Sequence, residues 1–204
     1  MSKLVHLDAS DEAVGDASRY LVGVKNGIEK VTMRAINRSL DAGKTALSRG
    51  VRDHYTVKKS TVHETLTVKR ASQTRLQGSI ESRGGPLPMR DFRHSPSDLN
   101  TTGKNRKPIR VSIKRGSSER IWGFKWQPSK KVDRAHVYTR VKGAKRRAGT
   151  DGIKRVPIEK KFSLSVPQMS GQSGVQEAVQ ERVREVFEER MEHETDRLLE
   201  RGAK

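Results

Sequence analysis

Residues 41–45 are the first candidate for chemistry, because they end like a phosphate-binding loop. The run Asp41-Ala42-Gly43-Lys44-Thr45 supplies the glycine, lysine and hydroxyl with which such a loop holds phosphates and their metal ion. The motif also needs a glycine five positions before Gly43, where Arg38 stands, and a preceding strand, where the pattern is helical. We therefore interpret Lys44 and Thr45 as solvated helical residues and predict no nucleotide site.

A zinc-protease motif is the second candidate. His193-Glu194 begins like HExxH, in which two histidines on one helix face hold the metal. Arg197 stands where the second histidine is required. Glu189 and His193 lie one helical turn apart, but no other histidine has a ligand spacing that completes the set. We predict a pair on the helix surface and no metal site.

An acid beside lysines is the third candidate, because metal-dependent nucleases place carboxylates near a cation to activate water. Glu159-Lys160-Lys161 and the distant Asp98 would have to serve, and the basic half of the chain has too few acids to complete such a site. Without cysteine or a nucleophile-elbow pattern, thiol and serine hydrolase chemistry also lack a candidate. We predict that the protein is not an enzyme and expect no catalytic residue, metal or cofactor.

The charge of the chain is more informative than these motifs. The formal net charge is +19 on 204 residues. Residues 104–147 hold 16 basic and 2 acidic side chains, whereas residues 175–201 hold 9 acidic and 5 basic ones. A basic middle and an acidic end point to large polyanionic or self-complementary partners rather than to a small substrate. The two regions can dock within one chain or between neighbouring copies.

Two sets of side chains are the candidate contacts. The basic set, expected to meet DNA or a partner protein, is Lys130, Lys131, Arg134, Lys142, Lys145, Arg146 and Arg147. The acidic set, expected to meet a neighbouring subunit, is Glu181, Glu185, Glu188 and Glu192. Aromatic residues among the basic ones, including Trp122, Phe124 and Tyr138, are also typical of a surface on which nucleic-acid bases stack. The plainer interpretation places Trp122 and Phe124 in the core and leaves many lysines solvating a face.

The helices that carry these residues follow from apolar periodicity. Residues 11–52 predict a long helix with Ser10 at its start and a kink or break near Gly23/Gly27 or Gly43. Residues 58–71 predict a second, shorter helix, which their β-branched side chains oppose. An apolar stripe from Val175 to Leu199 predicts an amphipathic C-terminal helix. Its acidic polar face favours packing on a sheet or a neighbouring subunit over binding to anionic lipid.

Alternating patterns predict the strands of the middle region. They fall at residues 75–82, 109–114, 121–126, 136–141 and 157–167. Long loops are expected at residues 91–107 and 143–152, and a basic hairpin loop at residues 127–134. Together these elements predict an α+β fold: a long N-terminal helix, a central antiparallel sheet with long basic loops, and a C-terminal amphipathic helix. We assign residues 1–9 to an N-terminal extension and residues 10–204 to a single domain.

Composition sets the size of the core. Only 32% of the residues are hydrophobic and 4% aromatic, so the core is thin for this length and part of the chain is expected to order against a partner. The N-terminus has no apolar run that would serve as a signal peptide, and no stretch reaches the ~18–20 apolar residues that span a bilayer. A soluble protein made in the cytoplasm is expected, and the absence of cysteine agrees with a reducing compartment.

The order of several short strings resembles a known family. Ala35-Ile36-Asn37-Arg38 on the first helix leads into Tyr55-Thr56-Val57-Lys58-Lys59 and then, after a strand, Arg83-Gly84-Gly85-Pro86-Leu87-Pro88. Val137-Tyr138-Thr139-Arg140-Val141 precedes a basic glycine-rich loop, and Ser165-Val166-Pro167-Gln168-Met169 precedes the closing helix. Over roughly residues 21–199, this order is similar to that of the minor tail protein Z family, the tail-completion proteins of long-tailed bacteriophages and their prophages.

The resemblance implies structural work without enzymatic activity. It implies a member of a ring of six or twelve copies at the head-proximal end of the tail, needed for head–tail joining. The implied partners are further copies, tail terminator and tube proteins, and head connector proteins, with the basic loops facing packaged DNA or an acidic neighbouring ring. The implied location is the virion, after assembly in the host cytoplasm. The alternative left open by the charge is a ribosome- or nucleoid-associated protein that binds nucleic acid.

Overall fold

Helices and short antiparallel strands make up the computed structural model, which describes residues 2–8, 12–22, 24, 26–95, 108–121, 123–126, 136–148 and 154–202. The chain divides into two compact units. Unit 1 comprises Met1–Val51, Val62–Gly84 and Val166–Lys204, and unit 2 comprises Arg52–Thr61 and Gly85–Ser165. The predicted α+β class is confirmed, while the assignment of residues 10–204 to a single domain stays a prediction. Among the described residues, no helix combines the length and apolarity that crossing a membrane requires.

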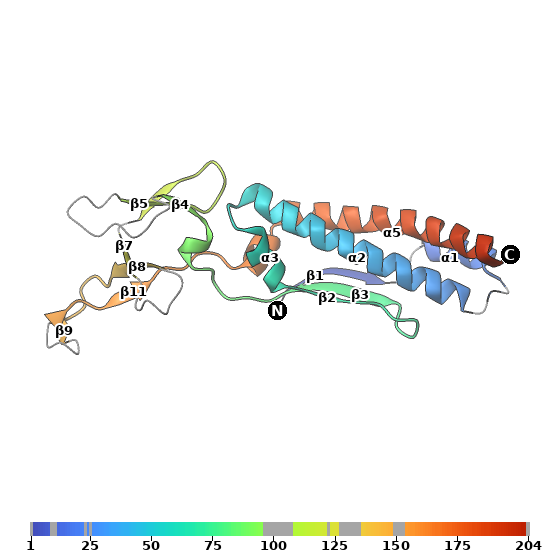
Figure 1. Ribbon diagram of the computed structural model, residues 1–204, viewed down its shortest axis with the longest axis horizontal. Coiled ribbons are helices and arrows are strands. Elements are labelled where there is room, and N and C mark those ends of the chain that lie inside the picture. Colours follow the sequence, from blue (N-terminus) through green and yellow to red (C-terminus); the bar gives the residue numbers. More distant parts are fainter. Residues whose placement is uncertain are drawn as a thin grey trace. The chain divides into compact units, whose positions relative to one another are not determined.

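Unit 1 contains the long helices. The predicted N-terminal helix is two helices, α1 (Glu12–Tyr20) and α2 (Gly27–His54), separated at the expected break near Gly27. Asn26, the residue before α2, has a positive φ of 54°, a conformation that asparagine tolerates better than most residues. The short α4 (Val166–Ser170) and the long α5 (Ser173–Gly202) close the chain. Figure 1 shows α2 and α5 side by side along the strands β1, β2 and β3 of the same unit.

Helices α2 and α5 pack antiparallel over most of their length. A Cβ added at Gly50 would lie 3.2 Å from Val175 Cγ1, and one at Gly27 would lie 3.4 Å from Leu198 Cδ2. Between these ends, a Cβ at Gly43 would lie only 2.5 Å from Val183 Cγ2. Gly43, where a break was one of the expectations, instead allows α5 to approach α2 closely. Its low helix propensity destabilises α2, and the close packing of α5 on α2 offsets this.

The buried stripe of α5 confirms most of the predicted one. Val175, Val179, Val183, Val186, Phe187 and Met191 are all buried. In the next two turns the stripe becomes polar, because Glu194 and Thr195 are buried there, whereas Leu199 is exposed. The C-terminal part of the helix interface therefore depends on paired polar groups as well as on apolar contact.

The sheet of unit 1 has the strand order β1-β3-β2 and is antiparallel throughout. Its strands are β1 (Ser2–Asp8), β2 (Leu66–Lys69) and β3 (Gln77–Ser82). On central β3, Ile80 is opposite both Val5 and Val68, and Gly78 leaves room for α2, since a Cβ there would lie 2.5 Å from Leu40 Cδ1. The sheet thus presents an apolar surface to α2.

Two predictions fail in this sheet. Residues 1–9 were expected to form an extension, but Ser2–Asp8 form β1, because Leu4, Val5 and Leu7 find a buried place beside β3. Residues 58–71 were expected to be helical, but α3 (Lys59–Thr65) ends where β2 begins at Leu66. The β-branched residues of that segment prefer the strand, and pairing with β3 stabilises it there.

Unit 2 contains two small three-stranded antiparallel sheets. The first has the order β4-β5-β6, formed by β4 (Arg93–Ser95), β5 (Ile109–Ser112) and β6 (Glu119–Ile121), and it follows the 3-10 turn η1 (Met89–Asp91). The predicted strand over residues 109–114 is confirmed for Ile109–Ser112. The loop predicted over residues 91–107 is shortened, since β4 begins at Arg93, and its residues 96–107 lie outside the described part of the chain.

The second sheet has the order β11-β8-β7, from β7 (Phe124–Trp126), β8 (His136–Arg140) and β11 (Ile158–Lys160). A separate pair, β9 (Arg147–Ala148) and β10 (Lys154–Arg155), lies within the predicted loop 143–152 and just after it. The strand expected over residues 121–126 is divided at Gly123, where a Cβ would lie 2.7 Å from the Tyr138 carbonyl oxygen. The strand expected over residues 157–167 ends at Lys160, and Val166 is instead the buried first residue of α4.

Candidate interaction surfaces

The basic segment of unit 2 begins with a tight turn after β8. The Ala144 amide donates to the Val141 carbonyl at 3.4 Å, and Gly143 between them has φ of +74°. A positive φ at the third position of a turn favours glycine, so the sequence Val141-Lys142-Gly143-Ala144 fits this geometry. The Val141 amide also donates to Pro157 at 2.9 Å, which holds the start of the turn against the neighbouring strand segment. The turn therefore presents a short run of cations from an anchored base.

Four of the seven predicted basic contacts lie in this segment, and all four are exposed: Lys142, Lys145, Arg146 and Arg147. No ion pair joins any of them to the residues that the structure describes. The other three, Lys130, Lys131 and Arg134, lie outside the described residues. We name the exposed four, with the backbone between them, the basic segment (residues 142–147).

Arginines stand opposite one another at two places in the strands of unit 2. Arg147 of β9 pairs in register with Arg155 of β10, and Arg110 of β5 pairs with Arg120 of β6. Like charges directly opposite on neighbouring strands destabilise the pair. Both pairs add to the positive charge of unit 2, and Arg120 and Arg155 each have a further interaction within the chain.

The four predicted acidic contacts are exposed residues of α5, in unit 1. Glu185 accepts a hydrogen bond from Arg182 at 2.9 Å on the same helix, which partly neutralises it. Glu188 and Glu192, one helical turn apart, line a cleft between α1 and α5. The acidic and basic sets therefore lie on different units, and contact between them stays a prediction.

The residues that resemble a phosphate-binding loop lie in the middle of α2. The Thr45 hydroxyl donates to the Asp41 carbonyl at 3.1 Å, one helical turn earlier. The Asp41 carboxylate accepts from Arg70 Nη2 at 2.8 Å. Because backbone amides inside a helix are already bonded, none is free to cradle a phosphate. The prediction of solvated helical residues holds for Thr45, and Asp41 is in addition an ion-pair partner.

Glu194, the acid of the zinc-protease fragment, is a structural residue. Its side chain is 7% exposed, and its carboxylate oxygens lie 3.1 Å from Arg34 Nη1 on α2 and 3.5 Å from Arg197 Nη1 on α5. A buried carboxylate requires such partners. The preceding His193 is exposed. The ion pair between Arg34 and Glu194 thus joins α2 to α5. The Glu194 carboxylate is already engaged by two guanidinium groups.

The nuclease candidate Glu159 is also occupied by its neighbours. Its Oε1 accepts from Lys161 Nζ at 2.5 Å and from Thr139 Oγ1 at 3.1 Å. The hydrogen bond from Lys161, followed by that from Thr139, lowers the pKa of Glu159. Asp98 lies outside the described residues. Within the described part of the chain, no three His, Cys, Asp or Glu side chains gather as a metal would need.

Two polar clusters escape sequence reasoning. In unit 1, the side chain of Glu81 is 4% exposed, with Lys69 Nζ at 2.5 Å and Arg83 Nη2 at 3.2 Å. The hydrogen bond from Lys69 is the largest cause that lowers the pKa of Glu81. Glu81 is buried because β3 is the central strand of this sheet. The sequence of β3 alone does not show that Lys69 of the neighbouring strand β2 pairs with Glu81.

The second missed cluster lies in unit 2, where η1 meets β8 and β11. Nε and Nη1 of Arg90 and Nδ1 of His136 are buried atoms without a hydrogen-bond partner, although Arg90 Nε lies 3.4 Å from Asp91 Oδ1. Burial, followed by the charges of Arg90 and Lys160, lowers the pKa of His136. Burial and Arg90 also lower the pKa of Lys160, whose Nζ lies 5.1 Å from the Phe162 ring centroid. Burial and neighbouring cations therefore disfavour the charged forms of His136 and Lys160 in this cluster.

Comparison with known proteins gives one result. A family model described as prophage minor tail protein Z (GPZ) matches residues 13–202, nearly the whole chain. No curated protein and no solved structure matches the chain.

Proposed function

Because the chain belongs to the prophage minor tail protein Z family, we propose that it is a non-enzymatic ring component at the head-proximal end of a long phage tail. There it completes the tail and prepares the head–tail junction. The proposed ring has six or twelve copies. Its neighbours are tail terminator and tube proteins on one side and head connector proteins on the other. The chain assembles in the host cytoplasm and stays in the virion.

The observation that carries this proposal is the separation of unpaired charges of opposite sign on the two units of one chain. The basic segment of unit 2 and the acids Glu188 and Glu192 of unit 1 are exposed and have no ion-pair partner among the described residues. A protein that bears both halves of a contact on different surfaces joins head to tail with its own copies, and such a contact closes into a ring when the rotation permits. Charged surfaces without internal partners also favour the correct neighbour during encounter.

The state of the candidate catalytic groups supports a structural role. Glu194 and Glu159, the acids of the two metal-dependent candidates, are held by arginine, lysine or threonine within the chain. An acid or base that serves catalysis has to reach a substrate. The buried Glu194 instead stabilises the position of α5, and the exposed Glu159 is held by Lys161 and Thr139.

Packaged DNA is a second partner that a specific observation favours. The basic segment gives unit 2 four exposed cations, Lys142, Lys145, Arg146 and Arg147, whose charge phosphates would neutralise. Titration of duplex DNA at several salt concentrations tests this partner, because log affinity falls by about 0.9 per neutralised phosphate for each tenfold rise in salt. A flat salt dependence, or no binding at low salt, would remove DNA from the list of partners.

Complementation tests the proposed function itself. A prophage without this gene is induced in cells that supply either the wild-type chain or the triple variant Lys145→Glu, Arg146→Glu, Arg147→Glu. The matched control reverses three exposed cations elsewhere, Arg38, Arg49 and Lys58. Without the chain, we expect filled heads and tails to sediment separately, and we expect the loop variant to yield fewer joined particles than the control. Normal infectivity in the absence of the chain would refute the proposed function. Normal infectivity of the triple variant would show that the basic segment makes no contact that joining requires.

A further inference from the structure

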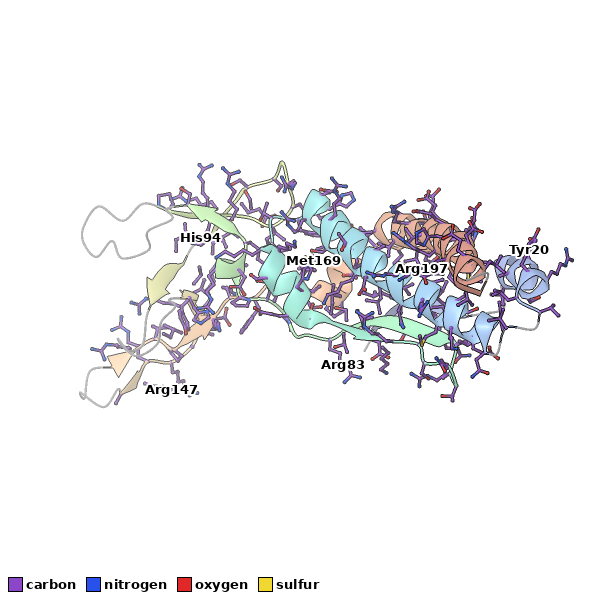
Figure 2. The ribbon with its side chains drawn as sticks, turned by 45° about the vertical axis from the view of Figure 1, so that its right-hand side comes forward. Tyr20, Arg83, His94, Arg147, Met169 and Arg197 are labelled. Atoms are coloured by element: carbon purple, nitrogen blue, oxygen red, sulfur yellow. The ribbon has the colours of Figure 1, made fainter. Side chains whose placement is uncertain are left out.

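A cleft between α1 and α5 of unit 1 has no assigned role. Its volume is about 360 Å³, and it is lined by Asp16, Ala17, Tyr20, Glu188, Met191, Glu192, Thr195 and Asp196. Figure 2 labels Tyr20 on α1 and Arg197 on α5, the two neighbouring helices that form it. Since Met191 and Thr195 are buried between these helices, the cleft has a packed floor and an open, charged rim.

The rim of the cleft is acidic on both sides. Four of its eight lining residues are carboxylates, and none is a lysine or arginine. Asp16 lies 3.5 Å from Arg19, whereas Glu188, Glu192 and Asp196 have no ion pair with a described residue. Within the described part of the chain no carboxylates gather closely enough to hold a metal ion. The negative charge is therefore spread out, which suits a partner whose positive charges are also spread along a chain.

The aromatic part of the cleft points to a protein partner. Tyr20 is 68% exposed at the rim, and Val22, two residues further, is 82% exposed. A tyrosine ring attracts a guanidinium or ammonium group over its face. Carboxylates together with a free ring bind arginine and lysine better than neutral side chains.

The basic segment of unit 2 has the matching chemistry. Its four cations lie within six residues, separated by Gly143 and Ala144, which add little bulk. All four are exposed and lack an ion-pair partner among the described residues. Lys142 lies within the turn Val141–Ala144, and Lys145, Arg146 and Arg147 follow it. The four cations of the basic segment thus match the four carboxylates of the cleft in number, and the Tyr20 ring is available to its arginines.

The position of the cleft in unit 1 favours a second copy as the source of this segment. The chain passes from unit 1 to unit 2 after Val51 and again after Gly84, and it returns to unit 1 at Val62 and at Val166. Gly50 of α2 lies against Val175 at the start of α5. From Val175 to Glu192 a helix rises about 25 Å. Glu192 therefore lies about 25 Å along α5 from Val175, whereas a neighbouring copy can bring its basic segment to the cleft from outside the chain.

We infer that the cleft lined by Tyr20, Glu188 and Glu192 is the docking site for the basic segment, residues 142–147, of a neighbouring copy of this chain. The contact is heterologous, since each copy offers a cleft on one unit and a segment on the other. The inference rests on the proposed ring and adds the two surfaces that would join its members.

The absence of cysteine from the sequence makes a direct test possible. One copy carries Glu192→Cys and a differently tagged copy carries Lys145→Cys, and a short bis-maleimide cross-links them after mixing. The same two variants are also co-produced during prophage induction, and the purified tails are cross-linked. We expect a dimer-sized band that contains both tags, which neither variant gives alone. Because each copy has one cysteine, a bond within one chain cannot produce it.

The matched control replaces another exposed acid of α5, Glu177→Cys, which lies about 22 Å along the helix from Glu192. It should give no mixed band with Lys145→Cys. In a second control, Glu188→Lys with Glu192→Lys should abolish association, and Lys145→Glu with Arg146→Glu in the partner should restore it. If tails contain the chain and the mixed band is missing both from tails and from solution, the inference is wrong. A band in solution with no chain in tails would support the inference and refute the proposed function.

Discussion

Replacing Gly43 by alanine tests the packing that positions the acidic helix. The added methyl would lie 2.5 Å from Val183 Cγ2 on α5 and 3.1 Å from Ile80 Cδ1 on β3. Carbon atoms in contact prefer about 3.5–4.0 Å, so α2 and α5 have to separate by about 1 Å or rearrange. Valine cannot easily rotate away, because in a helix it has one strongly preferred rotamer.

The expected size of the effect comes from two opposing contributions. Overpacking a core costs about 1–3 kcal/mol. Alanine also gains about 1 kcal/mol over glycine in a helix interior. We expect Gly43→Ala to lower the free energy of unfolding by roughly 1 kcal/mol, the difference between these contributions. Gly15→Ala in α1 is the matched control: nothing lies within 4 Å of its added methyl, so it should raise stability.

Urea unfolding followed by circular dichroism at 222 nm measures both variants. The signal reports mainly on unit 1, which contains α1, α4, α5 and nearly all of α2. The midpoint should fall for Gly43→Ala and rise for Gly15→Ala, with the same slope. Val183→Ala should reduce the cost of Gly43→Ala in the double variant, because it removes the clashing methyls. Equal stabilisation by both glycine replacements would refute the close packing of α2 on α5.

The other polar clusters give two predictions. Glu194→Ala should destabilise unit 1 by about 1–3 kcal/mol in the same unfolding assay, because it leaves Arg34 and Arg197 without their carboxylate. The control Glu192→Ala removes an exposed acid nearby and should change stability little. An equal loss of stability in both variants would contradict the pairing. The lowered pKa of His136 means that the unfolded chain takes up a proton more readily than the folded one, so stability present above the ordinary pKa of 6.5 should be lost as the pH falls through 6.5 towards the folded pKa. His136→Gln should remove this part of the pH dependence in unfolding followed between pH 5 and 8, and an unchanged profile would show that His136 is not the titrating group.

Local pattern in the sequence predicts the helices well. The spacing from Val31 to Val51 and from Val175 to Met191 identifies the buried faces of α2 and α5, because each stripe lies within one helix. The break before Gly27 also follows from local residues. Contacts between distant segments are the reason for the failures: Gly43 stays helical because Val183 approaches it, and residues 2–8 form a strand because β3 accepts them.

The candidate surfaces also include features that the sequence predicts and features that it does not. Charge and exposure of the basic segment and of Glu188 and Glu192 can be read from the sequence, since long charged side chains outside apolar stripes remain in solvent. The buried acids Glu81 and Glu194 cannot be recognised this way, because their partners Lys69 and Arg34 come from other elements. The cleft likewise depends on α1 turning back along α5, which no local pattern specifies.

Location of the chain in the assembled particle tests the central claim most directly. Virions from an induced prophage that encodes a C-terminally tagged chain are examined by electron microscopy with a gold-labelled antibody, and copies per tail are counted by mass spectrometry against the tail tube protein. Label at the head-proximal end of each tail, with a fixed multiple of six copies, is the predicted result. Label along the tube or at the distal tip, or absence of the chain from particles, would contradict the account.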